Sequence, residues 1–434
     1  MTDPARFVWR RLPPTTRTRL RPAVMLLRSV EAPWRMRPSP PALRPTRRIR
    51  PVPARSGHVS TAVSVVIPTR DAGPQFERVL AAVAAQRRVP DLEVVVADTA
   101  SSDGTRERAV EAGATVIDVA PGDYGHGRTR NVAVAAARGG VLLMLVQDAV
   151  LLGGDAVAVL VEELEADPRT AAVVARQVPR ADADLYGAFV VAAHEWMLAS
   201  DDSSLRARAG VDGVCTALRR SAWEELRFAD VAFAEDLELG VRAVAAGWSV
   251  RRSDRAAVAH SHNREPVYHF RRSAADRLHV APLLADDPVP SAARATAADL
   301  CASGLTLVGA ADVVAQALPD PVPLDDALGR LAARLARGGE AAQAARGPVV
   351  ALLGELAPDE PAPPRAAVAL RDELLGVLAS PVLRTFATAH PAVPAVQARR
   401  FVASLVAAVV GRAVGDALRL APDGATAARI LAGV

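Results

Sequence analysis

Short apolar runs alternate with segments of helical spacing between residues 63 and 146, and this alternation constrains the fold more than any other feature. The apolar runs end in polar or glycine-containing turns, as buried strands do. Strand and helix in strict alternation predict a right-handed, mostly parallel α/β sheet with helices on its faces. The expected strands are 63–68, 93–97, 115–119 and 141–146, and the expected helices between them are 74–86, 105–112 and 128–138.

The rest of the chain follows a looser pattern, in which a further strand is expected near 171–176. A chain of 434 residues exceeds what one hydrophobic core usually organises, so we expect more than one folded unit. Beyond about residue 290, Ala- and Leu-rich helical segments are separated by Pro-rich links. We therefore predict a basic Pro/Arg-rich arm without fixed structure over 1–60, an α/β domain over 61–285 and a helical accessory domain over 290–434.

The arm carries most of the positive charge. Every basic residue in the chain is Arg, and residues 1–60 hold fourteen of them against Asp3 and Glu31. Such a segment can act as an electrostatic tether to an anionic membrane surface or to nucleic acid, or it can be a solvated tail without a dedicated partner. Of the two partners, the membrane surface is favoured and nucleic acid is disfavoured.

Cysteine usage and hydropathy bear on the compartment. Only Cys215 and Cys301 are present, too few for a disulfide framework, which favours a reducing cytoplasm and two core thiols. Arg and Pro interrupt the N-terminal region, so no secretory signal is expected there. The most apolar windows, 141–146 and 401–410, are shorter than a bilayer span. We expect a cytoplasmic protein whose membrane contact, if any, is peripheral at the inner face of the plasma membrane.

Carboxylates at the ends of apolar runs point to a site. Asp98 ends one run, Asp148 ends another, and Glu235-Asp236 opens an amphipathic helix. A charged side chain at the tip of a buried strand must be solvated, paired or bound to a ligand. In a parallel sheet Asp98 and Asp148 face the same edge, where ligands of such sheets bind. A nucleotide could lie between them.

Five motifs follow one another along the chain: VSVVIPTRD, ADTASSDGT, GHGRTRN, LVQDA and AEDLELGVRAVAAGW. Taken in this order, they resemble glycosyltransferase family 2 over about Val63–Pro266. The resemblance implies a GT-A fold and inverting transfer of a sugar from a nucleotide-diphosphate donor. DYGHGRTRN, QDA and the later HSHN are similar to the rhamnosyltransferase-like branch.

The resemblance assigns donor-binding residues. It places Pro68 and Thr69 against the base and ribose, Asp98 on the base or ribose, and Arg130 on the nucleotide. The residues agree for Arg130, because a guanidinium at a helix start offers charge-assisted donors beside free backbone N–H groups. The alternatives are an exposed helix start for Arg130 and a turn-capping carboxylate for Asp98.

The same resemblance implies a divalent cation, Mn²⁺ or Mg²⁺. The family usually carries two aspartates separated by one residue, but here the triplet is Val146-Gln147-Asp148, so only Asp148 matches. Diphosphate oxygens would have to complete the shell. His260 and His262 lie two apart and would share a face of an extended segment, where they could add nitrogen ligands. The alternative is that both histidines are structural.

Asp236 is our candidate for the general base. In a single displacement the acceptor hydroxyl loses its proton as it attacks the anomeric carbon, through a transition state that resembles an oxocarbenium ion. Glu235 would orient the acceptor or Asp236. The alternative is that both acids merely complement the dipole of the helix they open.

The sequence thus favours an inverting glycosyltransferase acting on a glycan or lipid-linked acceptor, with dTDP-rhamnose as the donor that the branch suggests. One alternative is transfer from a UDP- or GDP-sugar on the same fold. Another is a catalytically silent GT-A scaffold, which the incomplete aspartate pair suggests.

Overall fold

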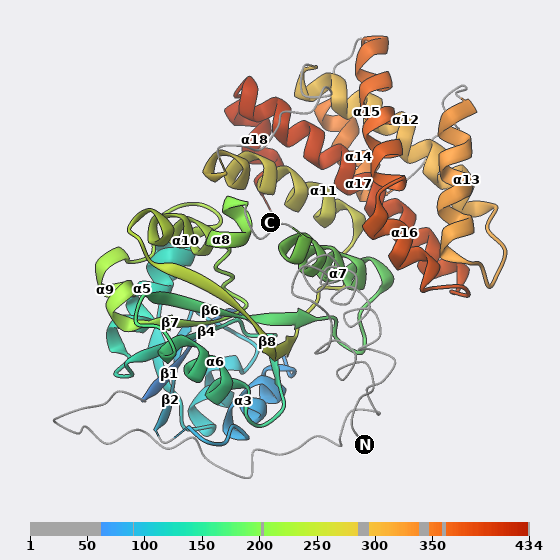
Figure 1. Cartoon of the computed structure of the whole chain (residues 1–434). Coiled ribbons are helices and arrows are strands. Elements are labelled where there is room, and N and C mark those ends of the chain that lie inside the picture. Colours follow the sequence, from blue (N-terminus) through green and yellow to red (C-terminus); the bar gives the residue numbers. More distant parts are fainter. Residues whose placement is uncertain are drawn as a thin grey trace. The chain divides into compact units, whose positions relative to one another are not determined.

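The computed structural model describes residues 62–89, 91–200, 204–284, 295–337, 347–357 and 362–432. The predicted arm, residues 1–60, lies outside them. The described residues form two compact units (Figure 1). The first unit comprises 62–181 and 195–260, and the second comprises 182–194 and 261–432. The domain boundaries expected near residues 60 and 285–290 remain predictions.

The first unit is built on a mixed eight-stranded sheet with the order β3-β2-β1-β4-β7-β6-β8-β5. β1 pairs in parallel with β2 and β4, β2 with β3, and β6 with β8, whereas β7 and β5 run antiparallel to their neighbours. The prediction of a mostly parallel sheet is confirmed. The strands are β1 Val63–Thr69, β2 Leu92–Asp98, β3 Thr115–Asp118, β4 Val141–Leu145, β5 Val150–Leu152, β6 Thr170–Val178, β7 Cys215–Arg219 and β8 Ser249–Ala259.

Helices cover both faces of this sheet. Side chains alternate along a strand, so Val65 of β1 faces a core shared with α3, α4 and α6, and Val66 faces a core shared with α5, α9 and α10 (Figure 1). The helices of this unit are α3 Phe76–Ala84, α4 Thr105–Glu111, α5 His126–Ala136, α6 Ala156–Glu165, α8 Leu205–Ala209, α9 Arg220–Leu226 and α10 Glu235–Ala245, with a short helical turn η1 at Pro121–Asp123.

Three strands were not predicted. β5 and β7 are short, and β8 contains Arg251, Arg252, Asp254 and Arg255, so its sequence reads as a polar loop. Neighbouring strands supply the hydrogen-bond partners that make these segments extended, which local periodicity does not report.

The second unit is helical. Its core includes an aromatic cluster in which Phe401 lies 5.6–6.0 Å, between ring centroids, from Tyr186, Phe189 and Phe386. Aromatic rings at these separations bury large apolar areas. α7, Leu185–Ser200, begins in this unit and ends in the first. Its other helices are α11 Pro266–Ala275, α12 Ala297–Gln316, α13 Leu324–Arg337, α14 Pro348–Leu356, α15 Pro364–Leu378, α16 Pro381–Thr388, α17 Ala395–Leu420 and α18 Gly424–Leu431, with shorter turns η2 Asp276–Val280 and η3 Ala281–Leu283.

Two of these helices, α12 and α17, are long and apolar enough to cross a membrane by length and composition alone. The apolar window 401–410, predicted from its own length to be too short for a span, is part of α17. In α17, 89% of the most apolar window is buried inside the structure, as in the central helix of a folded unit, against 44% in α12. The buried share shows that α17 has a packing role within this unit.

Candidate functional site

The ends of β1 and β2 are joined through buried side chains. Thr69 and Asp98 are register partners, and Thr69 Oγ1 donates to Asp98 Oδ1 at 2.8 Å. Asp98 also accepts hydrogen bonds from Ser101 Oγ at 2.6 Å and Ser101 N at 3.0 Å. The turn-capping role considered for Asp98 is therefore present. Its predicted contact with the base or ribose remains a prediction, as do those of Pro68 and Thr69.

Gln147 is the middle residue of the triplet in which Val146 stands where the family usually has the first aspartate and Asp148 matches the second. Its Oε1 accepts from Arg70 N at 2.8 Å, and its Nε2 donates to Arg70 O at 3.2 Å. This two-point bond ties the turn after β1 to the turn after β4. A carboxylate could not make both bonds, because it has no N–H to donate to Arg70 O.

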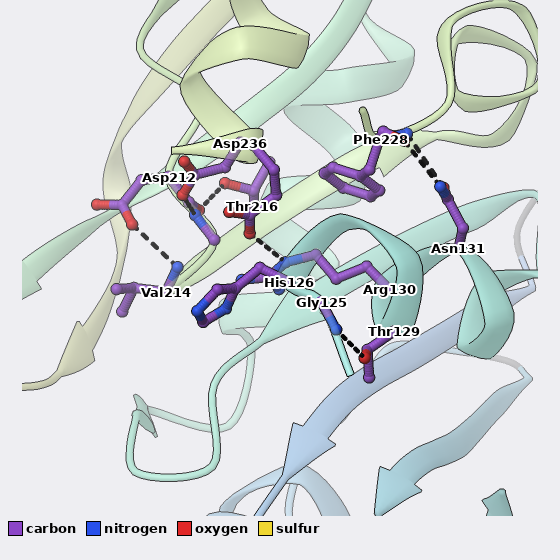
Figure 2. Close-up of polar contacts among 12 residues, drawn as sticks. Gly125, His126, Thr129, Arg130, Asn131, Asp212, Val214, Thr216, Phe228 and Asp236 are labelled. Atoms are coloured by element: carbon purple, nitrogen blue, oxygen red, sulfur yellow. Dashed lines mark hydrogen bonds and ion pairs between the residues drawn. The ribbon is translucent and has the colours of Figure 1, made fainter. Parts of the chain in front are cut away.

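Arg130 and Glu235 form a buried ion pair. Arg130 Nε lies 2.8 Å from Glu235 Oε1, and their side chains are 7% and 6% exposed. Figure 2 shows Arg130 reaching from α5 toward the segment that opens α10. Arg130 Nη1 is buried and has no hydrogen-bond partner among the described residues. The predicted contact of Arg130 with the nucleotide remains a prediction.

Asn131, next to Arg130, fixes the loop that leads to α10. Its Nδ2 donates to Phe228 O at 2.8 Å, and its Oδ1 accepts from Phe228 N at 3.1 Å and Trp223 Nε1 at 3.0 Å (Figure 2). Arg130 therefore binds Glu235 itself, and its neighbour Asn131 binds the backbone of Phe228 earlier in the same segment. This fixes where the Glu235-Asp236 pair begins its helix.

Asp236 is held by backbone donors. Its Oδ2 accepts from Gly213 N at 2.7 Å and its Oδ1 from Leu237 N at 2.8 Å. The carboxylate is half-buried, unlike the buried Glu235. Ala234, just before the pair, has φ of 60°, a left-handed conformation that costs a non-glycine residue about 1–2 kcal/mol. Such strain directly before two acids is typical of functional sites.

The two neighbouring acids have opposite pKa shifts. Burial raises the pKa of Asp236 to about 6, and the charges of Glu235 and Asp212 add to this effect against Arg130. Burial also opposes the charge of Glu235, but Arg130 and His126 outweigh it and hold the pKa of Glu235 below its ordinary value. A pair split in this way supplies one permanently charged acid and one that can accept a proton near neutral pH.

Asp148 and His260, both predicted cation ligands, lie close together in the structure. The two side chains are too far apart for a direct hydrogen bond. His260 Nε2 lies 3.7 Å from Asp148 Oδ1, and the side chains are 11% and 16% exposed. Two ligands that each lie about 2.0–2.2 Å from one cation can be separated by up to roughly 4.3 Å. The pair therefore fits two ligands of a divalent cation. His262 follows the end of the first unit at His260, and its part in a cation site remains a prediction.

The sequence of this chain matches known proteins. A family model described as glycosyl transferase family 2 covers residues 64–227. The O-antigen chain rhamnosyltransferase RfbN of Salmonella typhimurium (strain LT2) is 34% identical over 224 residues, covering 48% of this chain and 69% of the relative. The chain belongs to glycosyl transferase family 2. WbaN of Salmonella anatum, also an O-antigen chain rhamnosyltransferase, is 29% identical over 219 residues with the same coverage. The resemblance to the rhamnosyltransferase-like branch is confirmed.

Solved structures resemble this family 2 glycosyltransferase at low identity. The mannosyltransferase PcManGT from Pyrobaculum calidifontis, in complex with GDP-Man and Mn²⁺, is 22% identical with a TM-score of 0.44, covering 91% of this chain and 96% of that one. Glucosyl-3-phosphoglycerate synthase from Mycobacterium tuberculosis is 21% identical with a TM-score of 0.39, covering 53% and 81%. At these scores the likenesses bear on neither substrate nor metal. The sheet and the flanking helices themselves confirm the expected GT-A arrangement with a helical C-terminal region.

Sequence reasoning about this glycosyltransferase did not single out Gln177, Asp212 or His126. Gln177 lies near the end of the apolar strand β6, so the signal that led to Asp98 and Asp148 could have found it. Asp212 lies in a loop before β7 and has no local pattern to mark it. Only the fold brings its charge to bear on Asp236 (Figure 2).

Proposed function

We propose that this glycosyltransferase inverts the anomeric carbon of a nucleotide-diphosphate sugar in a single displacement, with dTDP-rhamnose as the donor and a glycan or a lipid-linked saccharide as the acceptor. The observation that carries the mechanism is the split pair, a charged Glu235 beside a partly accessible Asp236 whose pKa is raised to about 6. The two O-antigen rhamnosyltransferase relatives support the donor and the acceptor class.

In this reaction Asp236 accepts the proton of the acceptor hydroxyl as that oxygen bonds to the anomeric carbon. The bond from that carbon to the diphosphate oxygen breaks on the opposite face, and the nucleotide leaves as an anion. A carboxylate with a pKa near the working pH combines a large deprotonated fraction with useful basicity. Arg130 keeps Glu235 charged and fixed, so that Asp236 is the acid that changes its protonation.

Asp148 and His260 would hold the divalent cation, with His262 as a predicted third ligand. When bound, Mn²⁺ or Mg²⁺ supplies positive charge that stabilises the leaving diphosphate. With one carboxylate in place of two, donor oxygens would have to provide more of the shell. We therefore expect cation and donor to bind together. Pro68, Thr69 and Asp98 would contact the base and ribose, and Arg130 would contact the nucleotide.

A donor panel tests the proposal. Purified enzyme is incubated with dTDP-rhamnose, UDP-sugars and GDP-sugars, with and without Mn²⁺ and a saccharide acceptor, and release of the nucleoside diphosphate is measured. Faster release from dTDP-rhamnose, with an inverted product by NMR, supports the proposal. Preference for a UDP- or GDP-sugar would replace the donor. Nucleotide binding without turnover of any donor would favour the silent scaffold.

Asp148→Ala should weaken donor binding by at least about tenfold and remove its enhancement by Mn²⁺, because it takes away the carboxylate at the end of β4. Calorimetric titration with the donor, with and without the cation, measures both effects. Asp118→Ala is the control, since Asp118 also ends a strand at this edge but is exposed and bonded to Arg106. Equal enhancement by Mn²⁺ in Asp148→Ala and wild type would place the cation elsewhere.

The pH profile should report Asp236. Because the base works deprotonated and its pKa is about 6, kcat/KM should be level above about pH 7 and fall about tenfold per unit well below pH 6. Initial rates between pH 4.5 and 8.5 at low donor concentration give the profile. Asp212→Asn should move the acid limb to lower pH, because the Asp212 charge is one cause of the raised pKa. A profile without an acid limb near pH 6 would argue against Asp236 as the base.

Attachment to an anionic membrane surface through residues 1–60 remains a prediction from charge. Fourteen Arg against two acids would attract such a surface by about 1 kcal/mol per basic residue before screening. Cytoplasmic placement is part of the same proposal.

A further inference from the structure

Three polar side chains of the first unit form a chain of hydrogen bonds that ends beside Asp148. Gln177 Nε2 donates to Asp212 Oδ2, and Gln177 Oε1 lies 2.9 Å from Nδ1 of His260. Nε2 of the same imidazole is the atom that lies 3.7 Å from Asp148 Oδ1. The series of contacts thus runs from Asp212 through Gln177 and His260 to Asp148.

The direction of the bonds in this chain follows from chemistry. A carboxylate can only accept, so the Gln177 amide must present its NH₂ group to Asp212. Its carbonyl oxygen then faces His260 and can only accept, so His260 must donate from Nδ1. A neutral imidazole with its proton on Nδ1 carries its lone pair on Nε2, the nitrogen that faces Asp148.

Backbone hydrogen bonds fix the positions of Gln177 and His260 relative to each other. β6 and β8 are parallel neighbours, with Gln177 opposite Val258, and His260 N donates to Val178 O at 2.9 Å. Gln177 N donates to Glu195 Oε1 at 3.0 Å, and Arg252 binds both carboxylate oxygens of Glu195 at 2.9 and 2.8 Å. Gln177 and His260 are both buried. Turning over the Gln177 amide would break its hydrogen bonds to both Asp212 and His260.

We propose that Gln177 is a positioning residue that fixes the Nδ1–H tautomer of His260 and thereby aims the Nε2 lone pair at the cation site. The inference rests on the proposed cation site of Asp148 and His260. Imidazole ligands in metal sites commonly donate their other nitrogen to an acceptor, and loss of that acceptor costs about 10–100-fold in metal affinity. Asp212, at the start of this series of hydrogen bonds, also has a second effect, because its charge raises the pKa of the proposed base Asp236. One aspartate would then orient the cation ligand through Gln177 and tune the base.

The first test reads the tautomer without any metal. Nitrogen-15 NMR of the metal-free full chain should show His260 with its proton on Nδ1 in the wild type. Gln177→Leu should shift it to a mixture of tautomers or to Nε2–H. Gln86→Leu is the matched control, since Gln86 makes hydrogen bonds elsewhere in the same unit to Ala82 O, Gly153 O and Val157 N. An unchanged tautomer in Gln177→Leu would overturn the proposal even if the protein bound no cation.

The second test measures Mn²⁺ affinity by calorimetry. Gln177→Leu should weaken it about 10–100-fold, and Gln86→Leu should leave it near the wild-type value. In the exchanged pair Gln177→Glu with Asp212→Asn, the new carboxylate accepts from His260 and the new amide donates to it, so affinity should return to within about tenfold of wild type. Weak binding by the exchanged pair despite an intact Nδ1–H tautomer would overturn the link between tautomer and cation. Failure of Asp148→Ala to change Mn²⁺ binding would instead overturn the cation site of the proposed function.

Discussion

Asp236→Asn is expected to lower kcat by about 10²–10⁴-fold while leaving the dissociation constant of the donor within about threefold of wild type. The amide keeps the shape of the carboxylate and can still accept from Gly213 N, but it cannot take the proton of the acceptor hydroxyl. Steady-state kinetics for transfer, together with calorimetry of donor binding, separate the two quantities.

Glu238→Gln is the control for this variant. Glu238 lies in the same first turn of α10, but it pairs with Arg242 within the helix rather than facing the site residues. Its loss should change kcat by less than about threefold. Wild-type turnover in Asp236→Asn would remove Asp236 from the mechanism. Parallel loss of donor binding and turnover would show that the residue organises the site instead of acting as the base.

Arg130→Met is expected to lower the free energy of unfolding by about 3–5 kcal/mol, because it leaves the buried carboxylate of Glu235 without its partner. Urea denaturation at pH 7 measures the loss. Adding Glu235→Gln should recover much of it, because the buried charge is gone. Arg128→Met, on the same helix, is the control. Its partner Asp230 is 62% exposed, and surface pairs contribute at most about 1 kcal/mol.

The difference in unfolding free energy between wild type and Arg130→Met should change with pH in a direction that the pKa of Glu235 determines. In the wild type the lowered pKa of Glu235 stabilises the fold above the pKa of the unfolded chain, and this stability is lost as pH falls. In Arg130→Met, burial without the guanidinium should raise the pKa of Glu235 above its ordinary value. That variant then loses stability as pH rises through the raised pKa. The gap in unfolding free energy between the two proteins should therefore widen from pH 4 to pH 7, and a constant gap would mean that Glu235 is not the cause.

The framework of the site could be predicted from local sequence patterns. Apolar periodicity placed the strands that end at Thr69, Asp98 and Leu145, because each buried run carries its signal within a few residues. The same local signal marked Asp148 and the acids that open α10. The order of the motifs was enough to indicate the family, which the relatives then showed.

The partners that these residues face could not be predicted, because they depend on how the chain folds. Arg130 meets Glu235 across 105 residues of sequence, and Gln177 meets His260 across 83. Such pairs produce no periodic pattern in the sequence, because helix packing or strand register determines which residues meet. The pKa of Asp236 has the same origin, since burial and the charges of Glu235 and Asp212 act on it only once the chain is folded. A sequence pattern can mark an ionisable residue, but its surroundings in space fix its protonation.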